Sequence, residues 1–257
     1  MEDVNSHRPR HLPPVLSIDE FKGNAGGQKF QAILTNPLEH KLFDILPSRS
    51  QIELMLYLNE FHNKNEVRYF ITDMNRVYKD LAKPIFLNAT IVIDNIHVIR
   101  YVTWAMESVR KRIQKQLHPS KWKYFKRSRR LLLAHKEKLN EESLGALEVM
   151  LLQSLDLATA YHLKELFYAF MKSNDKAEAA KRLKYFLLAA QASQLKEFQA
   201  CLTMLGNWSA YILNAFECPY TNGYTEGMNN AIKVIKRNAF GYRNFKNFRN
   251  RIFLSLT

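Results

Sequence analysis

The change of hydrophobic period near residue 95 is the feature that most constrains the fold of this chain. Before it, short apolar runs separated by turn residues predict strands at 15–19, 29–35, 41–47, 67–72 and 89–94, the first three as an antiparallel meander. Helical spacing predicts a helix at 52–61 and a short one ending near residue 81. From residue 96 onward, apolar residues recur three or four positions apart, which predicts helices almost to the end of the chain. The sequence therefore predicts a mixed α/β domain interrupted by a helical region.

The positive charge of the chain is concentrated in its second part. The 257 residues carry a formal charge of +14, yet residues 1–100 hold 12 basic and 12 acidic side chains. Residues 110–138 contain twelve Lys and Arg against one acid, and residues 233–251 contain seven and no acid. Such a field attracts polyanions, nucleic acid foremost. Aromatic residues in these segments either stack on bases or belong to the core, namely Trp122, Tyr124, Phe125, Phe240, Tyr242, Phe245 and Phe248.

Several protein classes are excluded by composition. No run of 18 apolar residues exists, so we expect no membrane span, and the start of the chain has no apolar signal region. The two cysteines, Cys201 and Cys218, form neither a disulfide framework nor a zinc cluster and fit a reducing compartment. We therefore expect a cytoplasmic protein with no membrane partner and no small-molecule substrate.

Three aspartates come at the ends of predicted strands. Asp19, Asp73 and Asp94 each close an apolar run, and the carboxyl ends of strands are where α/β folds place their sites. Converging carboxylates repel one another unless a divalent cation neutralises them, and Mg²⁺ takes oxygen ligands of this kind. A single Asp at such a position is equally typical of a turn or a helix cap.

A predicted helix at 225–238 has two different faces. Its apolar stripe consists of Met228, Ala231, Ile232, Ile235 and Ala239. The opposite side begins with Glu226, continues with amides and ends in Lys and Arg. That order suits a metal ligand beside a phosphate backbone. It also suits an ordinary surface helix, since the helix dipole favours an acid at the start and bases at the end.

Four segments carry a family resemblance. They are IDEF (18–21), FITDMNRVY (70–78), IVIDNIHVIR (91–100) and, most specific, TNGYTEGMNNAIKVIKRNAFGYRNFKNFRNRI (221–252). This pattern resembles the DDE transposases of the bacterial ISL three insertion-sequence family, from Val15 to the end of the chain. The resemblance implies a ribonuclease H-like core, a mixed sheet flanked by helices, with a large all-helical insertion before the last catalytic helix. The expected division is an N-terminal tail at 1–14, core at 15–118, insertion at 119–217, and at 218–257 the catalytic helix and a basic helix that complete the core.

The same resemblance implies an active site. Its catalytic and metal-binding triad carries over as Asp19, Asp73 and Glu226, with Asp94 as the alternative second aspartate. His97 is then an accessory residue that can orient the scissile phosphate, or else a structural histidine. The implied chemistry is metal-dependent cleavage and strand transfer of insertion-sequence DNA ends, with Mg²⁺ as the cofactor and Mn²⁺ as a possible substitute.

The implied partner is double-stranded DNA, both the insertion-sequence ends and the target, bound by a homo-oligomer in the bacterial nucleoid. The residues expected to contact it are Lys233, Lys236, Arg237, Arg243, Lys246, Arg249, Arg127, Arg129 and Arg130.

One departure from the family pattern lies at the start of the chain. Members usually carry a zinc-binding and helix-turn-helix part before the catalytic domain, whereas here 18 residues precede Asp19, without a Cys/His cluster. We therefore expect a truncated reading frame. Two other interpretations stay open, a catalytically incompetent remnant that binds DNA non-specifically and another ribonuclease H-like nuclease.

Overall fold

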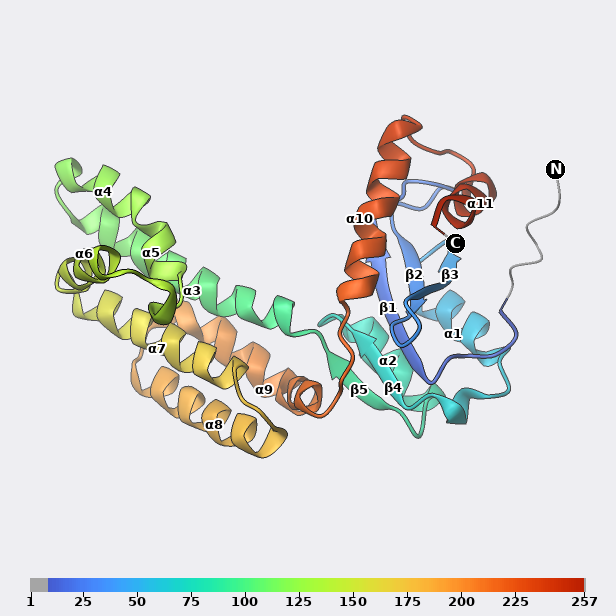
Figure 1. Ribbon diagram of the computed structural model, residues 1–257, viewed down its shortest axis with the longest axis horizontal. Coiled ribbons are helices and arrows are strands. Elements are labelled where there is room, and N and C mark those ends of the chain that lie inside the picture. Colours follow the sequence, from blue (N-terminus) through green and yellow to red (C-terminus); the bar gives the residue numbers. More distant parts are fainter. Residues whose placement is uncertain (1–8, 257) are drawn as a thin grey trace. The chain divides into compact units, whose positions relative to one another are not determined.

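The computed structural model describes residues 9–256, apart from the side chains of residues 95, 96, 121, 126 and 127. The chain divides into two units (Figure 1). We call Met1–Asp94 with Cys218–Thr257 the sheet unit, and Asn95–Glu217 the helical unit. The two units meet at 94/95 and 217/218, whereas the division expected from the sequence has its boundaries at 118/119 and 217/218.

The sheet unit is built on five strands. They are β1 (Val15–Phe21), β2 (Gln31–Asn36), β3 (Lys41–Leu46), β4 (Tyr69–Thr72) and β5 (Thr90–Ile93). Their order across the sheet is β3-β2-β1-β4-β5. The first three strands pair antiparallel as the expected meander, while β4 and β5 run parallel to β1. The mixed sheet flanked by helices confirms the fold class predicted from the sequence.

Four helices complete the sheet unit. They are α1 (Gln51–Asn59), α2 (Arg76–Ile85), α10 (Gly223–Asn238) and α11 (Phe245–Leu256). The last two share a core with the meander, formed by Phe21, Ala25, Ile33, Leu42, Ile45, Met228, Ile232, Phe248, Ile252 and Phe253. Burial of these side chains holds α10 against β1 and β2, because removing apolar surface from water is the main driving force of packing. Two members of the predicted stripe, Met228 and Ile232, are buried, while Ala239 is exposed.

Alternation along β1 gives its two faces different partners. Ser17 and Thr225 are hydrogen-bonded, so Ser17, and with it Asp19 and Phe21 two and four residues on, faces α10. Glu20 lies on the other face, where it accepts hydrogen bonds from α2 and from the residue that caps it. The sheet therefore lies between the pair α10 and α11 and the helix α2.

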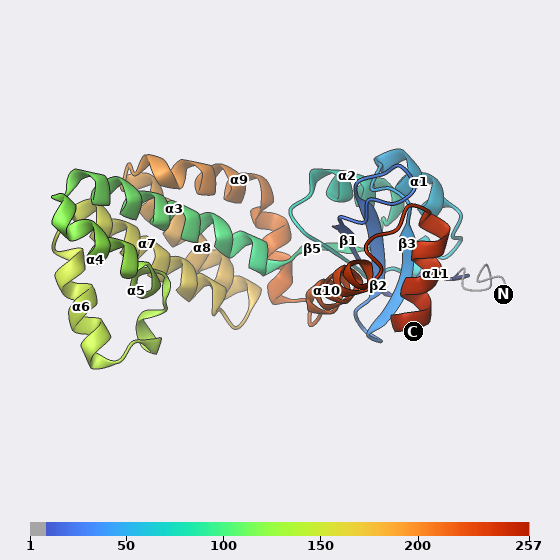
Figure 2. The ribbon, with the colours of Figure 1, turned by 90° about the horizontal axis from the view of Figure 1, so that it is seen from above.

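The helical unit contains seven of the described α-helices (Figure 2). They are α3 (Asn95–Gln116), α4 (Trp122–Arg127), α5 (Arg129–Leu133), α6 (Glu141–Leu151), α7 (Leu155–Met171), α8 (Lys176–Ala192) and α9 (Gln199–Leu213). Helix α3 packs on α7 and α9 through an apolar face that includes Val102, Met106 and Val109. That packing explains why the helical unit begins at 95, since α3 belongs to it from its first turn. Among the helices described here, none combines the length and the apolar composition that crossing a bilayer requires.

Candidate active site

The carboxyl ends of the three parallel strands meet at one edge of the sheet. Thr72 of β4 pairs with Ile18 of β1 on one side and with Ile93 of β5 on the other. The residue after each of these three is an aspartate: Asp73 and Asp94 follow the last residues of β4 and β5, whereas Asp19 lies inside β1, which continues to Phe21, at the point where its parallel pairing with β4 ends. Register alone therefore brings the three strand-end acids to adjacent positions.

The start of α10 is fixed to the sheet by a buried polar network. The Ser17 hydroxyl donates to Oδ1 of Asn222 at 2.5 Å, and the Thr225 hydroxyl donates to Ser17 at 3.0 Å. Thr35 of β2 lies 2.8 Å from Thr225 through their hydroxyl oxygens. Because buried polar groups are stable only when paired, this network determines where the first turn of α10 lies. Glu226 follows Thr225 directly and is thereby carried to the strand ends.

One side chain of α10 contacts the first aspartate. Asn229 is buried, and its amide nitrogen donates to Oδ2 of Asp19 at 2.8 Å. Its Oδ1 has no hydrogen-bond partner among the described residues. Asn229 lies one turn after Glu226, so both residues occupy the same side of the helix. The sequence placed an amide on this side, but the link to Asp19 joins positions 210 residues apart and has no local signal.

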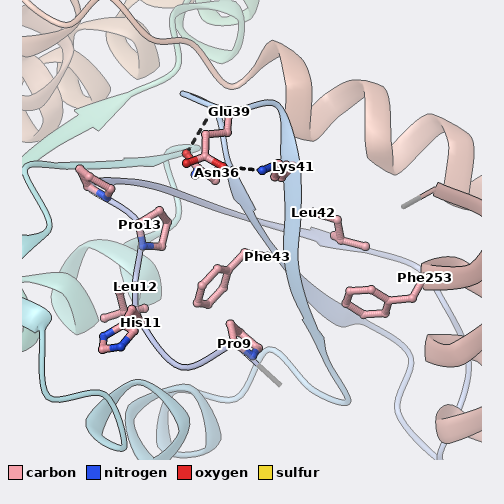
Figure 3. A pocket seen from close by; sticks show the side chains of 11 residues that line it. Pro9, His11, Leu12, Pro13, Asn36, Glu39, Lys41, Leu42, Phe43 and Phe253 are labelled. Atoms are coloured by element: carbon pink, nitrogen blue, oxygen red, sulfur yellow. Dashed lines mark hydrogen bonds and ion pairs between the residues drawn. The ribbon is translucent and has the colours of Figure 1, made fainter. Parts of the chain in front are cut away.

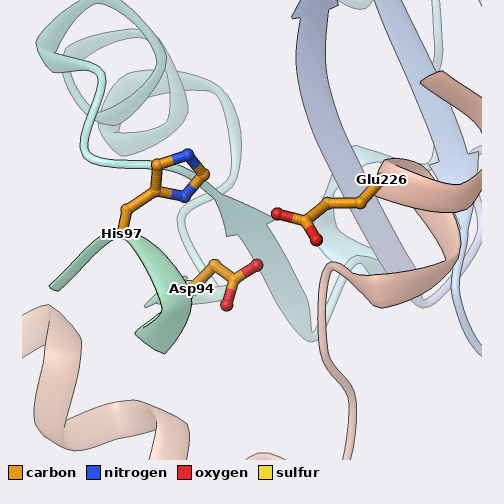
Figure 4. Close-up of side chains that lie close together, drawn as sticks. All are labelled: Asp94, His97 and Glu226. Carbon is orange, nitrogen blue, oxygen red and sulfur yellow. The ribbon is translucent and has the colours of Figure 1, made fainter. Parts of the chain in front are cut away.

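Glu226 also lies close to the second candidate aspartate. Asp94 and Glu226, both in the sheet unit, each have a carboxylate oxygen within 4.8 Å of the other (Figure 4). Asp94 is buried, and its backbone N–H donates to the carbonyl of Thr72 at 3.0 Å. His97 is in the first turn of α3, three residues after Asp94, and its Nδ1 is buried with no hydrogen-bond partner among the described residues. Carboxylate oxygens are ligands that a divalent metal accepts.

The electrostatics of the site show that the acids act on one another. The pKa of Asp19 is raised to about 7, mainly by burial and in smaller part by the charges of Asp73, Glu20 and Glu226, against a backbone hydrogen bond from the N–H of Glu20 that lowers it. Desolvation and like charge both disfavour the ionised form of a carboxyl group. A cation bound here would remove the repulsion between the carboxylates, so this arrangement of acids favours cation binding.

The neighbour of Asp19 has a different role. Glu20 pairs with Arg49 and accepts hydrogen bonds from the Tyr78 hydroxyl at 3.1 Å and from the Asn75 amide at 3.4 Å. Burial and the charge of Glu20 raise the pKa of Tyr78. These contacts tie β1 to the turn that carries Asp73 and the start of α2. Glu20 therefore makes contacts that stabilise the sheet unit.

The basic residues expected to contact DNA differ in how exposed their side chains are to solvent. Lys233, Arg237, Arg243, Lys246, Arg129 and Arg130 are exposed, and the side chain of Arg127 lies outside the described residues. Arg129 reaches Glu107 at 3.6 Å. Lys236 donates to the backbone carbonyl of Lys22 at 2.8 Å.

Arg249 is engaged inside the sheet unit. Its Nε and Nη2 donate to Oδ1 of the buried Asp44 at 2.9 and 2.6 Å, and Asp44 also accepts from the Tyr57 hydroxyl at 2.7 Å. The guanidinium lies over the ring of Phe253, 4.6 Å from its centre. The expectation that Arg249 contacts DNA competes with this ion pair.

Some aromatic residues of the basic segments are buried and others are exposed. Phe125 and Phe248 are buried in the cores of their units, so they are unavailable to bases. Trp122, Tyr124 and Phe240 are exposed. The core interpretation is therefore confirmed for Phe125 and Phe248, whereas stacking on bases stays a prediction for the exposed rings.

A surface pocket lies away from the acids. Its volume is 630 Å³, and its walls come from the segment before β1, from β2 and β3 and from Phe253 (Figure 3). Lys41 and Glu39 pair at 2.8 Å beside it. None of the strand-end aspartates lines this pocket, so it is separate from the candidate site.

Comparison with known proteins gives the family. The family model DDE_Tnp_ISL3, described as Transposase, matches residues 16–252. The chain is 25% identical over 238 residues to the transposase for insertion sequence element IS1001 of Bordetella parapertussis, covering 91% of this chain and 58% of that protein. The chain thus spans less than two thirds of the length of that relative. A segment of 57 residues, 22% of this chain and 18% of the other, is 44% identical to a protein named ATP-dependent protease from Lactococcus lactis subsp. lactis.

The family match covers both units and includes every strand-end aspartate and α10. The five-stranded mixed sheet, order β3-β2-β1-β4-β5, is consistent with the ribonuclease H-like catalytic domain expected from the resemblance. The chain belongs to the DDE_Tnp_ISL3 family of transposases.

Proposed function

We propose that this protein catalyses metal-dependent cleavage and strand transfer of insertion-sequence DNA ends, with Asp19, Asp73 and Glu226 as the catalytic triad. One observation carries the proposal. A glutamate on α10 lies where the ends of β1, β4 and β5 place three aspartates, and the charges of Asp73 and Glu226 both raise the pKa of Asp19. Carboxylates raise one another's pKa in this way when they are close and partly removed from water.

The donor set fits divalent metal ions. The residues are oxygen donors, and Asp19 is destabilised in its charged form, which a cation reverses. When bound, Mg²⁺ or Mn²⁺ would activate a water molecule or a 3′-hydroxyl and stabilise the leaving oxygen. Asp19, Asp73 and Glu226 are the residues that would hold the metal.

Other residues of the chain position this triad. Asn229 donates to Oδ2 of Asp19 and the backbone N–H of Glu20 donates to Oδ1, so the two hydrogen bonds fix the orientation of the carboxylate. Asp94 adds negative charge beside Glu226, and His97 offers a ring nitrogen that can donate to a phosphate oxygen. Asp73 is the second aspartate in this proposal because its charge acts on Asp19, whereas Asp94 lies beside Glu226.

The proposed substrate is double-stranded DNA, bound by a homo-oligomer. The similarity to the transposase for insertion sequence element IS1001 supports the choice of insertion-sequence ends. The exposed residues Lys233, Arg237, Arg243 and Lys246 follow Glu226 in a stretch without acids, so DNA phosphates bound there would lie along the same segment as the site.

A nicking assay tests the function. Purified protein is incubated with duplex DNA carrying the ends of its element, with and without Mg²⁺, and cleaved strands are resolved on a denaturing gel. Glu226→Gln should abolish metal-dependent cleavage, while Glu53→Gln, a change to an exposed acid on α1, should leave it intact. Equal cleavage by wild type and Glu226→Gln would refute the triad. Preferential cleavage of branched DNA would favour a different ribonuclease H-like nuclease.

The second aspartate is tested in the same assay. Asp73→Asn should reduce the cleavage rate at least about a hundredfold, the effect typical of losing an electrostatic catalytic group. Asp94→Asn should reduce it less. A larger loss in Asp94→Asn would exchange the roles of the two residues.

A further inference from the structure

The second residue after the end of α10 combines unusual exposure with an unfavourable backbone conformation. Phe240 is fully exposed, with a relative accessibility of 102%, and its φ is +53°. Glycine or asparagine ordinarily occupies this left-handed position after a helix, because a β-carbon there meets the backbone. An exposed Phe at this position therefore stabilises neither the core nor the backbone.

The loop that carries Phe240 is held on both sides. The N–H of Gly241 donates to the carbonyl of Lys236 at 2.9 Å, which closes the helix end. Tyr242 stacks on Phe248 with ring centres 4.6 Å apart and planes 13° apart, and the N–H of Gly26 donates to the carbonyl of Arg243 at 2.8 Å. The exposed ring is thus presented from a fixed loop.

Cations surround the base of this loop. Burial lowers the pKa of Lys236, and the nearby positive charge of Lys22 lowers it further. Arg237 and Arg243 are exposed on either side of Phe240. After Glu226 the sequence contains no Asp or Glu, so these charges have no acid on their own segment. Two lysines kept close together and exposed arginines on either side of the ring favour an anion such as phosphate.

We propose that Phe240 stacks on an unpaired DNA base while Lys236, Arg237 and Arg243 bind the flanking phosphates. This inference rests on the proposed function in taking DNA as the partner. An aromatic face and phosphate-binding cations are the two elements from which sites for single-stranded nucleic acid are built. Asn238, the last residue of α10, lies twelve residues after Glu226, which is about 18 Å along the helix, and Phe240 follows two residues later. That length corresponds to about five nucleotides of duplex, so the unpaired base would be near the DNA end being processed.

The test compares two oligonucleotides that carry the same phosphates. One is a single-stranded oligothymidylate and the other an abasic strand of equal length, and binding is measured by fluorescence anisotropy. Wild type should bind the thymidylate at least about fivefold more tightly than the abasic strand, the preference that one stacked base gives. Phe240→Gly should lose this preference without losing affinity for the abasic strand. Phe240→Trp should keep it, and so should Leu254→Ala, which removes an exposed apolar side chain from α11.

Thermal unfolding separates this role from a structural one. Because glycine suits the left-handed backbone, Phe240→Gly should raise the melting temperature by about 2 °C. A lower melting temperature would mean that the ring packs in the fold and would overturn the inference. An unchanged preference for thymidylate in Phe240→Gly would overturn it as well. If the wild-type protein does not nick DNA but still prefers the thymidylate to the abasic strand, the proposed catalysis is refuted and the inference about Phe240 stands.

Discussion

Replacing Asp19 by asparagine should stabilise the protein in the absence of metal while abolishing cleavage. The carboxyl group has a pKa of about 7 in the folded protein against an ordinary value of 3.8, mainly because it is buried. Between these values the folded state holds a proton that the unfolded chain has released, so folding stability falls as pH rises, and the full loss is present above pH 7. A difference of three pKa units corresponds to about 4 kcal/mol at pH 8 and to about 2 kcal/mol at pH 5.

Urea unfolding in EDTA at the two pH values measures this effect. The amide oxygen of the substituted side chain can still accept the hydrogen bond from Asn229, whereas the hydrogen bond that Oδ1 of Asp19 accepts from the N–H of Glu20 is lost at both pH values. The pH-dependent part of the difference therefore reports the charge. The stability advantage of Asp19→Asn over wild type should grow by about 2 kcal/mol from pH 5 to pH 8. Adding Mg²⁺ should stabilise wild type more than the variant, because only binding to the folded state shifts the equilibrium. An Asp19→Asn protein that is less stable at pH 8, or an advantage independent of pH, would refute the reasoning.

Two further predictions concern the basic residues of the sheet unit. Arg249→Ala should lower the free energy of unfolding, measured by urea denaturation, by about 3 kcal/mol, since it leaves the buried Asp44 carboxylate without its cation. The control Arg251→Ala removes an exposed arginine on the same helix and should change that free energy by less than about 0.5 kcal/mol. Replacing Lys233 and Arg237 together should weaken binding to all duplex sequences about equally and reduce the slope of log affinity against log salt by up to about two. An unchanged slope would mean that neither side chain meets a phosphate.

The sheet was accessible from sequence because its signals are local. Alternation and turn residues identify β1 to β5 to within a few residues, and an acid directly after an apolar run identifies Asp19, Asp73 and Asp94. The helix that carries Glu226 is equally visible from its apolar stripe. The parallel pairing of β1, β4 and β5 then brings the three aspartates to adjacent positions.

What the sequence could not supply depends on contacts between distant residues. Arg249 is identical in type to a DNA-binding arginine, and only the fold brings Asp44, 205 positions away, to its side chain. Asn229 has the same limitation, since its partner Asp19 is 210 positions away. The start of the helical unit at 95 has no local signal either, because α3 follows β5 almost directly and its place in the helical unit is decided by packing on α7.

The polar network that joins Ser17 to Thr225 has a consequence for how the sheet unit folds. It links two parts of one core that are separated in the chain by the entire helical unit, residues 95–217. Closing a flexible loop of that length costs about 4 kcal/mol of chain entropy. Within the helical unit, α3 begins and α9 ends at the same end of the bundle (Figure 1), so a helical unit that folds first replaces the flexible loop by a short closure. During synthesis the strand-end aspartates emerge long before α10, and the nascent chain therefore carries an incomplete set of acidic groups until its final helices dock.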